Sequence, residues 1–119
     1  DTHSPMYDKQ VSGDQKAGLG PVLTYGPAVH NNLLNMLIGV ASDNKIDFQR
    51  SAASRSTGTD TDAFAYSNNG VPSALISLPL KYMHTTVETA HEADVEKVID
   101  LMYEFLVQLP NNHDFSYLK

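Results

Sequence analysis

The chain has no cysteine, few basic side chains and no long apolar run. Without cysteine, disulfide bonds and thiolate metal ligands are both excluded, so His, Asp and Glu would have to hold any metal. Such ligands suit zinc, cobalt or manganese better than copper(I) or an iron–sulfur cluster. Because no apolar run approaches the roughly 20 residues that a membrane span needs, we expect no contact with a membrane.

Acidic residues outnumber basic ones, and the formal net charge is -6. No cluster of Lys and Arg is present to neutralise phosphates, so we expect no nucleic-acid partner. A length of 119 residues fits one domain with a real core. The chain does not start with Met, and we expect it to be processed or cut from something longer. Its start has no basic stretch followed by an apolar one, so we expect no signal peptide. The lack of cysteine does not determine the compartment, and a cytoplasmic location is the simpler expectation.

Predicted strands and helices alternate along the chain. The expected strands cover 22–25, 46–52 and 71–79, with a short extension at 87–89, and the expected helices cover 28–42, 61–68 and 92–109. This order predicts a layered α/β/α domain with a mostly parallel or mixed sheet. Strand 71–79 has little polar face, which is typical of a strand covered on both sides. A ligand site would then lie beyond the carboxyl ends of the strands.

The last predicted helix has an apolar stripe that we expect to face the core. It consists of Val95, Val98, Ile99, Met102, Phe105 and Leu106. The acidic residues of this helix are interpreted mostly as its solvated face, and they are Glu92, Asp94, Glu96, Asp100 and Glu104. Three other histidines lie on or near helix ends and are expected to face solvent, namely His30, His91 and His113.

His84 is the first candidate for chemistry, because it closely follows the apolar strand 71–79. Neutral imidazole is the commonest protein metal ligand, and a rigid strand end fixes its direction. The spacing alone favours a hydrogen-bonded loop histidine instead. Asp60 and Asp62 precede a helix, where capping and the helix dipole fully explain one carboxylate. Both could also support a ligating histidine. Asp1 is either a metal ligand at a strand end or part of a frayed terminus.

Four ordered motifs carry a resemblance to a known family. They are Gly58-Thr59-Asp60-Thr61-Asp62-Ala63-Phe64, Gly70-Val71-Pro72-Ser73-Ala74, Ile76-Ser77-Leu78-Pro79 and Tyr82-Met83-His84-Thr85-Thr86-Val87-Glu88. Together they resemble the C-terminal part of the dinuclear metallo-aminopeptidases, which include glutamyl aminopeptidase, the tetrahedral (TET) aminopeptidases and proteins once labelled cellulase M. The resemblance covers about residues 1–106. It implies a zinc-peptidase-like fold, with residues 1–119 as a C-terminal segment of a catalytic domain.

The resemblance also implies roles for individual residues. His84 matches a metal ligand, and Asp1 is the best match for the other ligand from this half of the family's site. Asp60, with Asp62 and Glu88, would support the site. Lys81 stands where the family usually has Arg, which keeps the charge but loses the planar fork. The implied cofactors are two divalent metal ions, zinc or cobalt. The implied partners are a peptide substrate, the remainder of the parent domain and further copies in a homo-oligomer.

Several family motifs are missing from this sequence. These are an N-terminal His-x-Asp segment, a bridging Asp, an adjacent Glu-Glu pair that includes the general base, and a β-rich insertion domain. We therefore expect an aminopeptidase segment that is inactive alone. One alternative is a non-catalytic or pseudo-enzyme module of the same fold. A weaker alternative is a glycoside hydrolase that uses Asp60 or Asp62 with Glu88.

Overall fold

The computed structural model describes residues 2–3 and 15–116, and it contains short strands and three helices within these ranges. In chain order the elements are β1 (Thr2–His3), β2 (Val22–Tyr25), α2 (Asn31–Asp43), β3 (Gln49–Ala52), α3 (Thr61–Ala65), β4 (Ile76–Ser77), β5 (Pro79–Lys81), β6 (Thr89–Ala90) and α4 (Glu92–Gln108). The predicted alternation of strands and helices is therefore present. None of the described helices combines the length and apolar character that crossing a membrane requires.

The strands form two small mixed sheets, with the orders β3-β2-β4 and β1-β5-β6. In the first, β2 is parallel to β3 and antiparallel to β4. In the second, β5 is parallel to β1 and antiparallel to β6. Only Leu78 separates β4 from β5, so the backbone passes directly from one sheet to the other. The predicted α/β class with a mixed sheet is confirmed.

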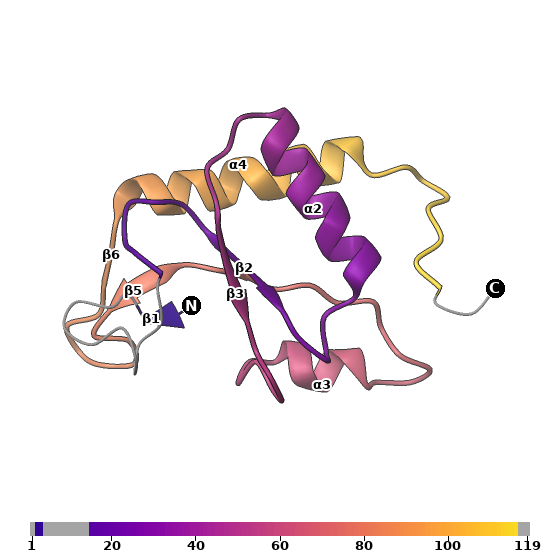
Figure 1. Cartoon of the computed structure of the whole chain (residues 1–119), viewed down its shortest axis with the longest axis horizontal. Helices are drawn as coiled ribbons and strands as arrows, with labels where there is room; N and C mark the ends of the chain where they lie inside the picture. The colour runs from indigo at the N-terminus through magenta and orange to yellow at the C-terminus, as the bar shows by residue number, and fades with distance from the viewer. Residues whose placement is uncertain (1, 4–14, 117–119) are drawn as a thin grey trace.

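The core lies where α2 packs against β2 and α4 (Figure 1). Its buried side chains are Leu23, Val29, Leu34, Leu37, Val40, Ala41 and Leu101. On α2, the buried positions 34, 37, 40 and 41 recur at helical spacing, as the sequence pattern predicts. Burying a Val or Leu side chain contributes about 1.5–3 kcal/mol to folding, so each of the buried aliphatic residues at this junction stabilises the fold.

The strand predicted over 71–79 is wrong in its first half. Only Ile76–Ser77 and Pro79–Lys81 pair as strands, and Leu75, Ile76 and Leu78 are half-buried rather than covered on both sides. Gly70 has a φ of 89°, and Pro72 has no N–H to donate to a ladder. The carbonyl of Ser73 instead accepts the N–H of His30, so this stretch runs as a loop beside the start of α2.

The strand predicted over 46–52 is also shorter than expected, because only Gln49–Ala52 pairs with β2. Gly20 explains where the pairing begins. Its φ is 94°, and a β-carbon added there would lie 2.1 Å from the carbonyl oxygen of Asp47. Only glycine allows the two backbones to approach so closely at a positive φ. The Gln49 side chain then donates to the carbonyls of Lys16 and Gly20, which ties β3 to this loop.

Asp94 corrects the expectation that the acids of α4 are solvated. Its side chain is fully buried, and its two oxygens accept the N–H groups of Gly18 at 2.7 Å and Gly20 at 2.8 Å. A buried carboxylate is tolerated because charged hydrogen bonds to both oxygens replace water. The first turn of α4 is thereby fastened to the loop that leads into β2.

The predicted core stripe of α4 is largely wrong as well. Leu101 is the buried apolar residue of this helix, and Phe105 packs partly against the core. Most of the predicted stripe is exposed, namely Val95, Ile99, Met102 and Leu106. The helix therefore turns a different face to α2 than its strongest apolar pattern predicts.

Candidate functional site

His84 lies in a tight turn between β5 and β6, one of the positions where the sequence predicted a ligand site. Tyr82 and His84 both have positive φ values, 55° and 61°, a conformation that costs energy for residues with a side chain. Glu88 holds the turn, because its Oε2 accepts the backbone N–H of His84 at 2.7 Å. The side chain of His84 is exposed. The turn thus fixes the His84 backbone and presents one imidazole at the surface.

Glu88 therefore supports His84 through the backbone of the turn. Thr85 adds a second lock, since its hydroxyl donates to the carbonyl of Tyr82 at 2.6 Å and its N–H donates to the same oxygen. These bonds stabilise a turn in which Tyr82 and His84 adopt positive φ values that residues with a side chain otherwise avoid. The predicted supporting role of Glu88 remains a prediction, but this contact gives it a physical basis.

Asp62 organises the loop that precedes α3. Its Oδ1 accepts from the N–H and the hydroxyl of Thr57, at 3.0 and 2.9 Å, and its Oδ2 accepts from the N–H of Gly58 at 3.0 Å. The pKa of Asp62 is lowered from its ordinary value, chiefly by the backbone N–H of Thr57, against a smaller effect of burial. The charged form of Asp62 is therefore favoured, and both of its oxygens accept hydrogen bonds from the loop.

Asp60 occupies the N-cap position of α3, but its side chain makes no capping hydrogen bond. Thr59 accepts the N–H of Thr61 instead, at 3.3 Å. The Asp60 carboxylate is exposed and lies at the start of a helix of only five residues. Capping, which the sequence offered as a full explanation of one carboxylate, does not explain this one.

The residues that the structure describes do not complete a metal centre. Within 2–3 and 15–116, no group of three or more His, Asp or Glu side chains is placed to hold an ion. Asp1, the second predicted ligand, lies outside the described residues. The next residue, Thr2, pairs with Pro79 in the strand that leads to His84, so β1 and the His84 turn belong to one sheet. His84 is thus an exposed histidine of the described residues that lies next to this sheet.

The matches to known proteins agree with these features. Residues 2–101 match the family model described as M42 glutamyl aminopeptidase. The chain belongs to this family. It is 36% identical to the lysyl aminopeptidase of Pyrococcus furiosus over 92 residues, which are 77% of this chain and 27% of the relative. The resemblance carried by the motifs at 58–88 is thus confirmed at the level of the family.

Solved structures show the same relationship. A TET aminopeptidase from the marine sediment archaeon Thaumarchaeota archaeon SCGC AB-539-E09 superposes with a TM-score of 0.82 and 26% identity, over 92% of this chain and 32% of its own. The dodecamer PhTET1-12s superposes with a TM-score of 0.68 and 31% identity, over 82% of this chain and 29% of its own. The chain spans about a third or less of the length of these relatives. It corresponds to a partial domain.

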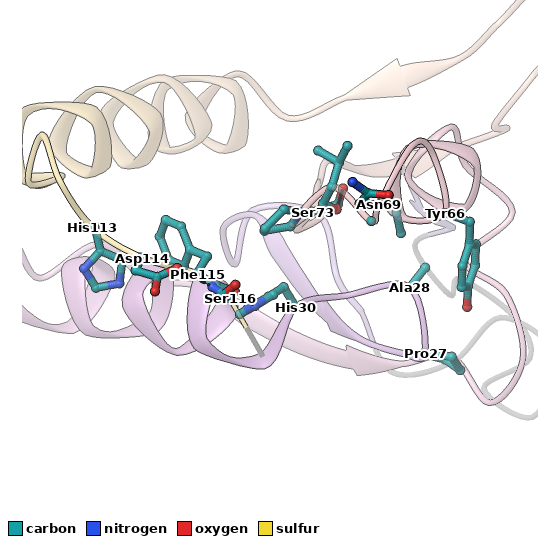
Figure 2. Close-up of a pocket in the computed structure, with 14 residues that line it drawn as sticks. Pro27, Ala28, His30, Tyr66, Asn69, Ser73, His113, Asp114, Phe115 and Ser116 are labelled. Atoms are coloured by element: carbon teal, nitrogen blue, oxygen red, sulfur yellow. Dashed lines mark hydrogen bonds between the residues drawn. The ribbon is translucent and has the colours of Figure 1, made fainter. Parts of the chain in front are cut away.

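A pocket of about 690 Å³ lies at the start of α2, away from the His84 turn (Figure 2). His30, Tyr66 and Phe115 are among its lining residues, and none comes from the loops around Asp62 or His84. His30 is almost completely buried, which corrects the expectation that it faces solvent. His91 and His113 are exposed, as predicted.

His30 has two structural roles that the sequence did not reveal. Its Nδ1 accepts the N–H of Leu33 and caps α2, so the proton of the neutral ring sits on Nε2. Nε2 then donates to the carbonyl of Phe115, whose ring stacks edge-on to the imidazole at 5.8 Å. Histidine is an uncommon helix cap, and the tail contact joins residues 85 positions apart. Neither feature has a local sequence signal.

Proposed function

We propose that the chain is the C-terminal segment of a metal-dependent aminopeptidase catalytic domain, to which it contributes part of the metal site. The observation that carries this proposal is the exposed imidazole of His84 on a turn locked by Glu88, at the position where the family resemblance implies a metal ligand. Membership in the M42 family supports a peptidase. In this proposal Asp1 is the second ligand from this chain.

The donor set fits such a contribution, but not a whole centre. A closed zinc site needs three or four donors, and His84 supplies one nitrogen among the described residues. When bound, two divalent ions, zinc or cobalt, would polarise a peptide carbonyl and lower the pKa of a water. Within this chain, His84 ligates, Glu88 orients its backbone, and Asp62 holds the 57–62 loop in shape. The general-base glutamate belongs to the remainder of the domain.

The partners follow from this division of the site. The substrate is a peptide with a free N-terminus, and the remainder of the parent domain completes the centre. The dodecameric state of PhTET1-12s supports a homo-oligomer, and the proposed location is the cytoplasm. The 119-residue chain alone is inactive in this proposal.

A chimaera tests the activity. This chain would replace the matching 92-residue segment of the Pyrococcus furiosus lysyl aminopeptidase, and hydrolysis of lysyl- and glutamyl-p-nitroanilide would be followed. We expect hydrolysis that a chelator abolishes and that added zinc or cobalt restores. The isolated chain is the control and should be inactive. A folded chimaera without activity, or with chelator-resistant activity, would contradict the proposal.

A non-catalytic module of the same fold is the second candidate, and the incomplete donor set of the described residues favours it. A glycoside hydrolase has less support. Asp62 already accepts three hydrogen bonds from its own loop, and Glu88 accepts the N–H of His84 in its own turn, so both carboxylates have structural contacts in place. Cleavage of carboxymethyl-cellulose by the chimaera without metal would revive that candidate.

A further inference from the structure

The outer face of α4 is an apolar surface without a packing partner in the described residues. Val95, Ile99, Met102, Tyr103 and Leu106 follow the spacing of one helix face, and all are exposed, Ile99 by 60% and Leu106 by 63%. With the neighbouring Val107 they expose on the order of 600 Å², which is at the upper limit for the largest apolar patch of a monomer. We call these six residues the α4 outer face.

The opposite side of the same helix is already used. Leu101 is fully buried in the core, and Phe105 packs partly against it where α4 meets α2. Figure 1 shows α4 and α2 lying together above β2 and β3. A helix that is apolar on two sides is typical of an element packed between two layers. The described part of the chain provides one of those layers.

The charged residues beside the α4 outer face indicate what kind of polypeptide would pack against it. Glu92, Glu96 and Asp100 are exposed beside the α4 outer face, on one of its borders. The helix has a single basic residue, Lys97, and this pairs with Asp47 at 3.2 Å. A second copy of this chain would bring the same acidic border against itself, which disfavours self-association. A partner with basic residues around an apolar centre fits better.

We propose that the α4 outer face is the docking surface for the remainder of the aminopeptidase domain, through an apolar element bordered by Lys or Arg. This inference rests on the proposed function, which makes the chain a segment of a larger domain. The relatives contain the necessary polypeptide, because this chain covers only 32% of the TET aminopeptidase that it matches over 92% of its own length. The face would form most of one side of a standard interface of about 800 Å² per partner.

Cysteine labelling tests the docking directly, since the chain has no cysteine of its own. Met102→Cys would be reacted with a maleimide in the isolated chain and in the chimaera, and labelling of residue 102 read by mass spectrometry. Because an interface core excludes water and reagent, we expect labelling to slow by about tenfold or more in the chimaera. Asn35→Cys, at an exposed polar position of α2, is the matched control and should react at similar rates in both. Equal rates for residue 102 would overturn the proposal.

Paired substitutions add a thermodynamic readout. Ile99→Glu with Leu106→Glu should leave the melting temperature of the isolated chain nearly unchanged, because both positions are already exposed. The same pair should lower the melting temperature of the chimaera, because it buries charge at an interface. Phe64→Glu, at a similarly exposed position on α3, is the comparison. A dimer of the isolated chain that Ile99→Glu abolishes would overturn the proposal in favour of a second copy.

These readouts do not depend on catalysis. Slow labelling of residue 102 in an inactive chimaera would leave the docking surface standing and count against the proposed function. Fast labelling of residue 102 in an active chimaera would overturn the docking surface and leave the proposed function standing.

Discussion

Asp62 illustrates how a single carboxylate shapes the candidate site without belonging to a metal centre. Its two oxygens collect backbone and hydroxyl donors from Thr57 and Gly58, and these bonds favour the charged form. Asp60, two residues earlier, makes no capping bond and is exposed. The sequence predicted the same possible roles for Asp60 and Asp62, and only the geometry of the loop distinguishes them.

The lowered pKa of Asp62 predicts a pH-dependent stability. Because the folded-state pKa lies below the ordinary value of 3.8, the carboxylate contributes stability above that pH, and the contribution is lost as the pH falls through the folded-state pKa. Asp62→Asn should therefore lower the melting temperature more at pH 7 than at about pH 3, because protonation of Asp62 has begun to remove its contribution at the lower pH. Thermal melts at both pH values would check this, with Asp60→Asn as the control. An equal effect of Asp62→Asn at both pH values would contradict the account.

At the scale of elements, the sequence predicted which helices exist better than which way they face. The spacing of Leu34 and Leu37 predicted α2, and the apolar stripe of the last helix predicted α4 close to its actual bounds. The buried face of α4 was not predictable, because apolar residues lie on two sides and the choice depends on long-range packing. Asp94 was missed for the same reason, since its partners Gly18 and Gly20 lie more than 70 residues away.

The predicted strand boundaries were wrong although the sequence contained local signals against them. Gly70 directly precedes the predicted strand 71–79 and Pro72 lies inside it, yet the prediction gave more weight to the apolar residues that follow. Gly20 has a role that no pattern reveals, because it depends on the carbonyl of Asp47 in a different segment. The sequence placed His84 shortly after an apolar strand, but it did not reveal the positive φ values of the turn or the contact with Glu88.

Substitution of two glycines by alanine should change the stability of the fold in opposite directions. Gly20→Ala should destabilise the fold by several kcal/mol, roughly the cost of overpacking plus a strained positive φ, because its new β-carbon would meet the Asp47 carbonyl. Gly39→Ala should stabilise it by about 0.5–1 kcal/mol, because Gly39 lies inside α2 with nothing within 4 Å of an added β-carbon. Urea unfolding of both variants measures the difference. A neutral Gly20→Ala would show that the backbones do not approach as described.

At the scale of the molecule, a buried core stands beside His, Asp and Glu side chains that, within residues 2–3 and 15–116, do not group to hold a metal. The α4 outer face and the small set of metal donors support the same proposal, in which further polypeptide covers the face and supplies the other ligands. The longer relatives contain such polypeptide. Composition excluded thiolate ligands, and the motifs identified the family. The number of missing ligands could be judged only from the family resemblance and from the placement of the described side chains.

The isolated chain should bind zinc weakly or not at all. His84 and Asp1 together provide fewer donors than a closed site requires. Calorimetric titration of zinc into the 119-residue chain measures this, and the chimaera serves as the positive comparison. Tight stoichiometric binding by the chain alone would show a self-sufficient centre and contradict the division of the site.

The most direct test of the central claim is the aminopeptidase activity of the chimaera with His84→Ala. If His84 is a metal ligand, its removal should reduce hydrolysis of lysyl-p-nitroanilide by about 100-fold or more, since even residues that only support metal ligands can cost 10–100-fold. His113→Ala, at another exposed histidine, should leave the rate nearly unchanged. A His84→Ala chimaera that hydrolyses the substrate as fast as the unsubstituted one would contradict the account.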